Sequence, residues 1–220
     1  MSKLIKAIAV ALVIAIILSV CGFSNECAGI RESVLRLHVL ANSDSEEDQA
    51  LKLKVRDTIT ETAAGLFDRI TTEGEALEQA KARLPELQAA AQQCVWDEGY
   101  DYTVRAELCD MYFTTRVYET VTLPAGMYDA LRISIGEGEG RNWWCVVFPP
   151  MCVSTAVEHS ELEDVLTPPQ QDIVTQPQKY EVRFKIVEVI EEICNEVRSW
   201  FGADEAILAS VSEEPDKENQ

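Results

Sequence analysis

Cysteine and histidine are the side chains in this sequence whose chemistry could support catalysis or metal binding. The chain of 220 residues holds seven cysteines and two histidines. A thiol and an imidazole could together hydrolyse a substrate, with Cys145 as the nucleophile and His38 or His159 as the base. Cys145 lies in a bulky apolar run, however, where a thiolate is disfavoured and access is poor. Two histidines without a Cys-x-x-Cys pair do not make a metal-ligand set. The sequence therefore predicts no catalytic residue, no metal and no cofactor.

The cysteines raise a second question, which is whether they form disulfides. Cys145 and Cys152 are the best local pair, because Pro149 and Pro150 can turn the chain back between them. A disulfide between them would stabilise this region modestly. Buried free thiols are the alternative, and the spacing of the cysteines does not decide between the two.

Two polar segments that follow predicted strands are the candidates for a recognition site. They are residues 42–48, where a strand ends and a helix begins, and residues 136–142, which hold three glycines. Recognition loops are commonly displayed from rigid elements, and neither segment has an evident role in the core. We therefore expect a protein partner to contact the polar and glycine positions Asn42, Asp44, Asp48, Gly136, Glu137, Gly138, Glu139 and Asn142.

The same residues allow two other interpretations of these segments. A phosphate-binding loop would have to join a strand to the N-terminus of a helix. The glycines are instead followed by a second strand, and Glu137 and Glu139 would repel phosphate. The remaining alternative is that Ser43 and Asp44 only cap a helix while the glycines only turn a hairpin.

Alternation of apolar and polar residues predicts the strands that carry these segments. Residues 34–40 alternate, which predicts a strand that enters the core, with His38 on its more polar face. Residues 131–135 alternate as well, which predicts a strand with one buried and one solvated face. Residues 143–148 are apolar at every position, which predicts a central strand covered on both sides. We expect a hairpin at the glycines to join the last two of these strands.

Helical spacing of apolar residues appears in three further stretches, at residues 51–66, 77–94 and 180–201. Pro85 lies inside the second stretch and is expected to kink or divide it. Residues 102–108 and, less regularly, 111–121 add two strands. Together these elements predict an α+β fold, with a mainly antiparallel sheet of about five strands, two early helices and a C-terminal helix, preceded by an export signal.

The sequence divides into five parts. Residues 1–28 begin with Lys3 and Lys6 before an aliphatic run, which is typical of a signal peptide or an N-terminal membrane anchor. A lipoprotein signal at Cys21 is less well supported, because Val20 is branched. Residues 29–153 form the core α+β domain, and residues 154–178, rich in proline and glutamine, an irregular connecting loop. Residues 179–209 are the docked C-terminal helix, and residues 210–220 a disordered tail.

The chain is strongly acidic, with a formal net charge of −19 and an isoelectric point near 4.4. Such a surface repels phosphate backbones, so a nucleic-acid partner is excluded. Anionic lipid head groups are disfavoured for the same reason. We expect membrane contact only through the N-terminal segment, if that segment is not cleaved.

Two long motifs in this sequence closely resemble stage II sporulation protein R of endospore-forming bacteria. They are RLHVLANSDSEEDQALKLKVRD at residues 36–57 and PAGMYDALRISIGEGEGRNWWCVVFPPMC at residues 124–152. The helix YEVRFKIVEVIEEI at residues 180–193 is also similar to that family.

The resemblance implies an intercompartmental signal of endospore formation that has no enzymatic activity of its own. Such a protein is made in the forespore and exported across its membrane into the space between forespore and mother cell. There it activates a membrane-bound sporulation aspartic protease, which matures the precursor of a mother-cell sigma factor. The alternative from a different class is an exported cysteine-dependent hydrolase that acts on cell-wall material. The sequence predicts no particular oligomeric state.

Overall fold

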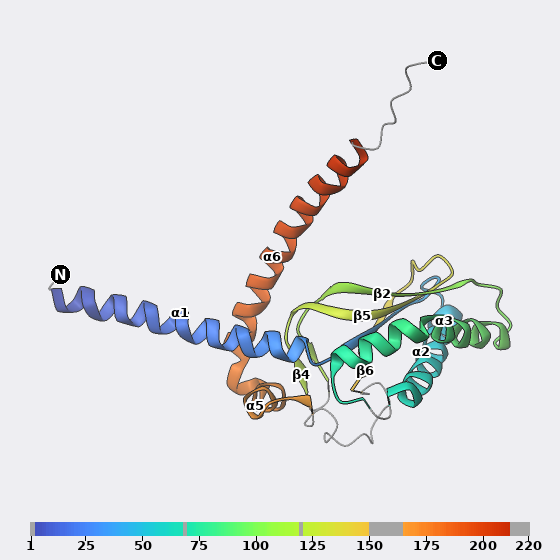
Figure 1. Ribbon diagram of the computed structural model, residues 1–220, viewed down its shortest axis with the longest axis horizontal. Helices are drawn as coiled ribbons and strands as arrows, with labels where there is room; N and C mark the ends of the chain where they lie inside the picture. Colours follow the sequence, from blue (N-terminus) through green and yellow to red (C-terminus); the bar gives the residue numbers. More distant parts are fainter. Residues whose placement is uncertain (1–2, 68–69, 119–120, 150–164, 212–220) are drawn as a thin grey trace, which may run out of the picture.

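The computed structural model describes residues 3–67, 70–118, 121–149 and 165–211, and every structural statement below concerns these residues. The elements follow the chain in the order α1 (Lys3–Arg31), β1 (Leu35–Leu40), α2 (Glu46–Phe67), α3 (Glu73–Asp97), β2 (Val104–Phe113), β3 (Arg116–Val117), β4 (Thr122–Leu123), β5 (Gly126–Ile135), β6 (Asn142–Phe148), α5 (Pro168–Thr175) and α6 (Pro177–Val211). Figure 1 shows that α1 and α6 extend away from the body that the sheet, α2 and α3 form.

The main sheet has four strands in the order β2-β5-β1-β6 within the described part of the chain. β1 runs parallel to β5 and antiparallel to β6, and β2 runs antiparallel to β5. The short strands β3 and β4 pair separately. The α+β class is confirmed, whereas the predicted mainly antiparallel sheet of about five strands is corrected to a mixed sheet of four. The sequence predicts a central strand at residues 143–148, but β6 lies at the edge of the sheet, and β1 is central in its place. Alternation along a strand shows which side chains are buried, but it does not show the direction of the neighbouring strand.

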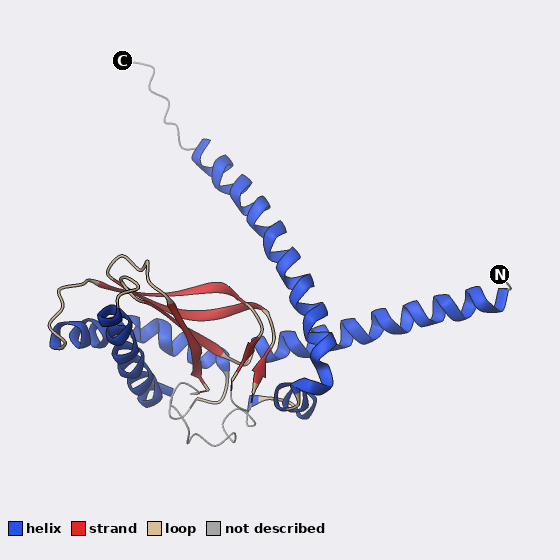
Figure 2. Ribbon diagram, turned by 180° about the vertical axis from the view of Figure 1, so that it is seen from behind, coloured by secondary structure: helices blue, strands red, loops and turns tan. Residues whose placement is uncertain are grey.

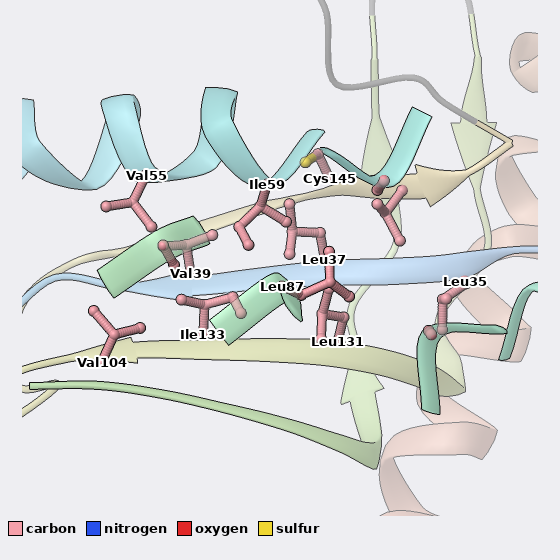
Figure 3. Packing of buried hydrophobic residues seen from close by; sticks show 14 of the residues in the cluster. Leu35, Leu37, Val39, Val55, Ile59, Leu87, Val104, Leu131, Ile133 and Cys145 are labelled. Carbon is pink, nitrogen blue, oxygen red and sulfur yellow. The ribbon is translucent and has the colours of Figure 1, made fainter. Parts of the chain in front are cut away.

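α2 and α3 cover one face of the sheet, and the larger apolar core lies between them and the strands. Figure 3 shows side chains from β1, β2, β5 and β6 meeting side chains from both helices in this layer. The labelled residues are Leu35, Leu37, Val39, Val104, Leu131, Ile133 and Cys145 from the strands, and Val55, Ile59 and Leu87 from the helices. Burying each large aliphatic side chain contributes about 1.5–3 kcal/mol to folding.

The opposite face of the sheet is covered by the C-terminal half of α1, by α5 and by the first half of α6 (Figure 2). Phe23 of α1 stacks on Tyr180 with ring centroids 5.6 Å apart and meets Phe184 edge-on at 5.4 Å. Arg31 and Glu191 join the same two helices through an ion pair of 3.0 Å. The predicted docking of the C-terminal helix on the core therefore involves its first half and depends on α1.

The central strand β1 is buried on both faces, as expected of a strand that enters the core, and the more polar face that carries His38 is also shielded from water. Arg36, which shares that face with His38, is fully buried. Its Nε donates to the carbonyl oxygen of Cys145 at 3.2 Å, and its Nη2 donates to the Tyr118 hydroxyl at 2.8 Å. Its guanidinium carbon lies 4.2 Å from the centroid of the Phe113 ring. The polar alternation in β1 therefore does not indicate contact with water.

Prolines interrupt the helices less than the sequence suggests. α3 continues from Glu73 to Asp97 as one helix with Pro85 inside it. Pro168 and Pro169 occupy the first two positions of α5, where a missing N–H removes no helical hydrogen bond. The prediction of an irregular connection over residues 154–178 is therefore wrong for its last part, which forms α5 and the start of α6. Residues 154–164 lie outside the described part of the chain.

α1 is a single helix, so the predicted boundary at residue 28 falls inside an element and not between two. Phe23, Cys27 and Ile30 from its last part are buried in the core. Among the described helices, none is both long and apolar enough to cross a membrane. The export signal and its cleavage stay predictions. α6 reaches Val211, and most of the predicted tail lies beyond the described residues.

Candidate functional site

The two predicted recognition segments, residues 42–48 and residues 136–142, lie side by side at one edge of the sheet. The reason is the parallel pairing of β1 with β5, in which Leu40 is opposite Ser134. The segments that follow two parallel neighbouring strands leave the sheet at the same edge. We call residues 41–48 the first loop and residues 136–142 the glycine loop.

The glycine loop passes over the end of β1, because β1 lies between β5 and β6 in the sheet. Backbone N–H groups of Glu139 and Gly140 donate to the carbonyl oxygens of Asn42 and Ala41, at 3.3 and 2.9 Å. The N–H of Glu137 donates to Oδ1 of Asn42 at 3.1 Å. The predicted hairpin between β5 and β6 is therefore corrected to a crossing connection that is hydrogen-bonded to the first loop.

Close approach between the two loops requires glycine at two positions. Gly136 has a positive φ of 57°, and a Cβ atom there would lie 2.3 Å from Oδ1 of Asn42. A Cβ atom at Gly140 would lie 2.1 Å from the carbonyl oxygen of Ser43. Both distances are far shorter than any van der Waals contact, so these glycines fix the fit of one loop on the other.

Asp48 is the buried anchor of the first loop, with 4% of its surface exposed. Its carboxylate accepts hydrogen bonds from Nδ2 of Asn42 at 2.9 Å and from Oγ of Ser43 at 2.6 Å. Its own N–H donates to Oγ of Ser45, which caps α2, at 3.1 Å. Burial alone would raise the pKa of Asp48, but hydrogen bonds from Ser43, Asn42, Tyr102 and Ser45 hold that pKa below its usual value. Asn42 and Asp48 thus have structural roles, which corrects the expectation that this segment has none.

Lys52 and Arg141, which the residue pattern does not mark as site residues, connect the first loop and its helix to the glycine loop through further hydrogen bonds. Nζ of Lys52 donates to the carbonyl oxygen of Arg141 at 2.9 Å, although the lysine is 5% exposed. Burial is the main cause that lowers the pKa of Lys52, and the nearby Arg141 charge adds to it. The N–H of Arg141 donates to Oδ1 of Asp44 at 2.7 Å. Lys52 could have been noticed from its position one helical turn after Asp48.

Asn142 closes the far end of the glycine loop through His38. Nε2 of His38 lies 3.0 Å from Oδ1 of Asn142, and the imidazole stacks on Trp144 with ring centroids 3.8 Å apart. Burial lowers the pKa of His38, and the hydrogen bond with Asn142 opposes this shift only in part. A neutral imidazole held in this way positions the loop end.

The sheet separates the residues of the hypothetical cysteine–histidine pair. Cys145 is opposite Leu37 and packs in the core under α2 and α3, whereas His38 is opposite Trp144 on the other face. Cys145 is disulfide-bonded. Cys152 and His159 lie outside the described residues, so the pairing of Cys145 with Cys152 stays a prediction. A hydrolase that uses Cys145 with His38 is incompatible with this arrangement.

What the two loops present to solvent is mainly carboxylate. Asn42, Ser43 and Asp48 point into the joint between the loops, while the side chains on the outside are charged. We call the exposed carboxylates of this edge the acidic rim: Asp44, Glu46, Glu47, Glu137 and Glu139. The rim stands on a hydrogen-bonded base, and Arg141, paired with Asp44 at 3.5 Å, is an exposed cation beside it.

Comparison with known proteins places this edge inside the part of the chain that a family model matches. The family model of stage II sporulation protein R matches residues 31–158, which include β1, both loops and β6. The chain belongs to the stage II sporulation protein R family. Stage II sporulation protein R of Bacillus subtilis strain 168 is similar, with 38% identity over 128 residues. That match covers 58% of this chain and 57% of the relative. No solved structure matches the chain.

The family assignment supports a role in sporulation. The resemblance stated from the sequence motifs is therefore confirmed at the level of the family. Each of the eight residues predicted for partner binding falls within residues 31–158. The geometry divides these eight into an internal group, which holds the loops together, and an external group at the acidic rim.

Proposed function

We propose that this member of the stage II sporulation protein R family is an exported signal of endospore formation. In this proposal it acts between the forespore and mother-cell membranes and activates a membrane-bound aspartic protease. The protease then matures the precursor of a mother-cell sigma factor. The chain contributes binding and no bond-breaking chemistry.

The acidic rim is the observation that carries the proposal. It lies within the family match, and it is displayed on two loops whose conformations are fixed by each other. A surface that is ordered before binding loses little conformational entropy on association. Carboxylates at the outside of such a surface favour a partner with a basic patch and accelerate the encounter with it.

Activation by this surface requires a preference between two states of the protease. A ligand shifts an equilibrium only by the difference in its affinity for the two states. The rim would therefore have to fit the active protease better than the inactive one. We place the contact outside the forespore membrane, since Lys3 and Lys6 precede the aliphatic stretch of α1 and basic residues stay on the cytoplasmic side.

Co-reconstitution with the protease in a membrane, scored by sigma-factor processing, tests the proposal. The informative variant carries Glu137→Lys with Glu139→Lys, because both side chains are exposed. We expect it to activate the protease poorly, by about tenfold or more, while it melts at the wild-type temperature, since like charges would now face the partner. Activation by the wild-type protein should also weaken as salt is raised.

A matched control reverses two charges away from the loops. Glu78→Lys with Glu86→Lys changes the net charge equally on the exposed face of α3, where these side chains are 76% and 51% exposed. We expect normal activation from this control. Full activation by the Glu137 and Glu139 variant would place the contact elsewhere, and equal loss in both variants would indicate an effect of net charge alone.

A further inference from the structure

The helix α6 has two apolar faces, and only one of them packs against other residues that the structure describes. Phe184 and Val187 are buried against the body, and Glu191 pairs with Arg31 on the same side. At about 100° per residue, Val182, Ile186, Val189 and Ile193 fall within about 60° of one another on nearly the opposite side of the helix. They are 73%, 38%, 54% and 55% exposed. We call these four residues the outer stripe.

The outer stripe is accessible along its length. α6 rises away from the sheet in both views, and α1 leaves the body in a different direction (Figures 1 and 2). Ile190 and Val197 widen the stripe with 43% and 42% of their surfaces exposed. A continuous row of exposed β-branched residues on a docked helix is typical of an interaction surface, since scattered exposed residues would not keep this spacing.

The spacing of the stripe is symmetric about the point between Val187 and Glu188. Val182 and Ile193 are equally far from that point, and so are Ile186 and Val189. When two copies of such a helix run antiparallel, each residue meets the residue at the mirrored position of its partner. Val182 would then pack on Ile193 of a second copy and Ile186 on Val189, with the alternating steps of four and three that interlocking helices need.

The charges at the ends of the stripe follow the same symmetry with opposite signs. Lys179 and Glu196 are mirrored about the same midpoint, so an antiparallel pair places each ammonium opposite a carboxylate. Lys185 and Glu192 flank the stripe on one side, and antiparallel packing brings them together across the interface. Within the chain, Lys179 pairs with Asp172 at 2.6 Å and Lys185 with Glu188 at 2.9 Å, and these exposed ammonium groups would share or exchange these partners on association. In a parallel pair, Lys179 would face Lys179 and Glu196 would face Glu196. The charge pattern therefore selects the antiparallel arrangement.

We propose that the outer stripe of α6 is a self-association surface, through which two copies of this chain pair with antiparallel α6 helices. The same residue patch is used by both copies, as a twofold interface requires. The body of each copy lies on the far side of its α6, where Phe184 and Val187 dock, and leaves the stripe open. This pairing is independent of the acidic rim and of the protease.

A lipid surface suits the stripe less well than a second copy. Helices that lie on membranes carry an excess of Lys and Arg along the polar face. The polar positions of α6 between Lys179 and Arg198 are mixed, with acidic residues at Glu181, Glu188, Glu191, Glu192 and Glu196 against basic residues at Lys179, Arg183, Lys185 and Arg198. Lipid binding is thus the rival outcome of the test.

Sedimentation equilibrium of the full chain in detergent micelles tests the pairing. All variants keep α1, so differences among them report on α6. Ile186→Asp should weaken association by about tenfold or more, because a carboxylate would be buried at the centre of the interface. Lys185→Glu and Glu192→Lys should each weaken it by about threefold, and the double charge swap should restore it, because flanking pairs contribute modestly. The control swap Glu78→Lys with Lys81→Glu on α3 should have no effect.

Cross-linking tests the orientation in a background with Cys21→Ser and Cys194→Ser, because both cysteines are exposed and free. Cys21→Ser is kept in every arm. A mixture of Lys185→Cys and Glu192→Cys proteins should form a cross-linked heterodimer. With the native Cys194 restored and no added cysteine, antiparallel helices hold the two Cys194 residues roughly 20 Å apart, so that no disulfide should form.

Ready formation of the Cys194 disulfide overturns the antiparallel arrangement. A chain that stays monomeric at all concentrations overturns self-association, and loss of vesicle flotation in Ile186→Asp would assign the stripe to lipid.

Discussion

The two faces of β1 show two different ways to bury a strand. Leu35, Leu37 and Val39 pack under α2 and α3 in a mainly aliphatic layer that also contains Phe67 and Phe148. On the other face, Arg36 and His38 are also buried but are surrounded by aromatic rings, and Arg36 makes two hydrogen bonds where His38 makes one. The stability of the first face comes from the apolar area that it buries. The stability of the second face comes from the hydrogen bonds and ring contacts that each buried polar group makes.

The polar face shows that a charged side chain, the Arg36 guanidinium, can be buried without a carboxylate beside it in the part of the chain that the structure describes. Arg36 has no carboxylate partner among the described residues, and its Nη1 is without a hydrogen bond there. It is held by a carbonyl oxygen, a tyrosine hydroxyl and the faces of Phe113 and Tyr128, at 4.2 and 5.0 Å from the guanidinium carbon. Aromatic faces attract a desolvated cation and partly replace its hydration. We therefore expect substitutions on the polar face to change stability differently from substitutions in the apolar core.

Removal of α1 residues should produce the largest effect. A chain that begins at residue 29 lacks Phe23 and Cys27, whereas one that begins at residue 22 keeps both. Loss of a buried phenylalanine alone costs about 3–5 kcal/mol of unfolding free energy, so the shorter chain should have a much lower urea midpoint. Phe23→Ala in the longer chain is the matched control and should account for most of the difference. Equal urea midpoints for the two truncated chains would mean that packing of α1 on the polar face does not contribute to stability.

Leu37→Ala tests the apolar face and should have the next largest effect. The side chain is fully buried, and such truncations cost about 2–5 kcal/mol because they leave a cavity. Chemical denaturation followed by circular dichroism measures the change. Leu53→Ala on the same layer is the control, since Leu53 is 36% exposed, and its effect should be small. A small effect at Leu37 would contradict the assignment of that face as the main core.

Arg36→Met should change stability much less, by less than about 1.5 kcal/mol. Methionine fills a similar volume, and replacement of a buried charge by an apolar group is often neutral or stabilising. Arg36→Lys, which keeps the charge but loses the planar fork, should be the less stable of the two. Thermal unfolding of the two variants decides this. If the Arg36→Met protein melts far below the Arg36→Lys protein, the positive charge is needed for stability, and contact with the aromatic rings is not sufficient.

Glu73 should produce the smallest effect, and one that depends on pH. It lies beside Asp129, which faces Asp110 across β2 and β5 at the edge of the apolar face. Burial, together with the Asp129 charge and the hydrogen bond to it, raises the pKa of Glu73 to about 7. The folded chain then binds a proton more tightly than the unfolded chain, so the contribution of Glu73 to stability is fully present below pH 4.5 and is lost as pH rises through 7.

Glu73→Gln keeps the hydrogen bond but cannot ionise. Its melting temperature should fall less than that of the wild type between pH 6 and pH 8, and it should be the more stable protein at pH 8. Subtraction of the two curves removes the repulsion that the whole acidic chain contributes. Parallel curves would show that Glu73 is ionised in the folded state throughout this range.

Local features of the fold could be predicted from residue patterns. Apolar spacing located α2, α3 and α6, and the uninterrupted apolar run at residues 143–148 located β6, although β6 is an edge strand and not the central strand that the run predicted. The two recognition segments were found because turn-forming and glycine residues mark where strands end. These signals depend on neighbours in the chain, so the sequence contains them directly.

Only the tertiary structure shows how the two recognition segments contact each other. Parallel pairing of β1 with β5 brings residues 42–48 and 136–142 to one edge, where Asn42 and Asp48 become internal and the acidic rim external. The same pairing places β1 at the centre, so that Arg36 and His38 are buried although the residue pattern shows only that they share the more polar face. Strand direction and neighbour order depend on contacts between residues about 95 positions apart, such as Asn42 with Glu137, and no local pattern records them.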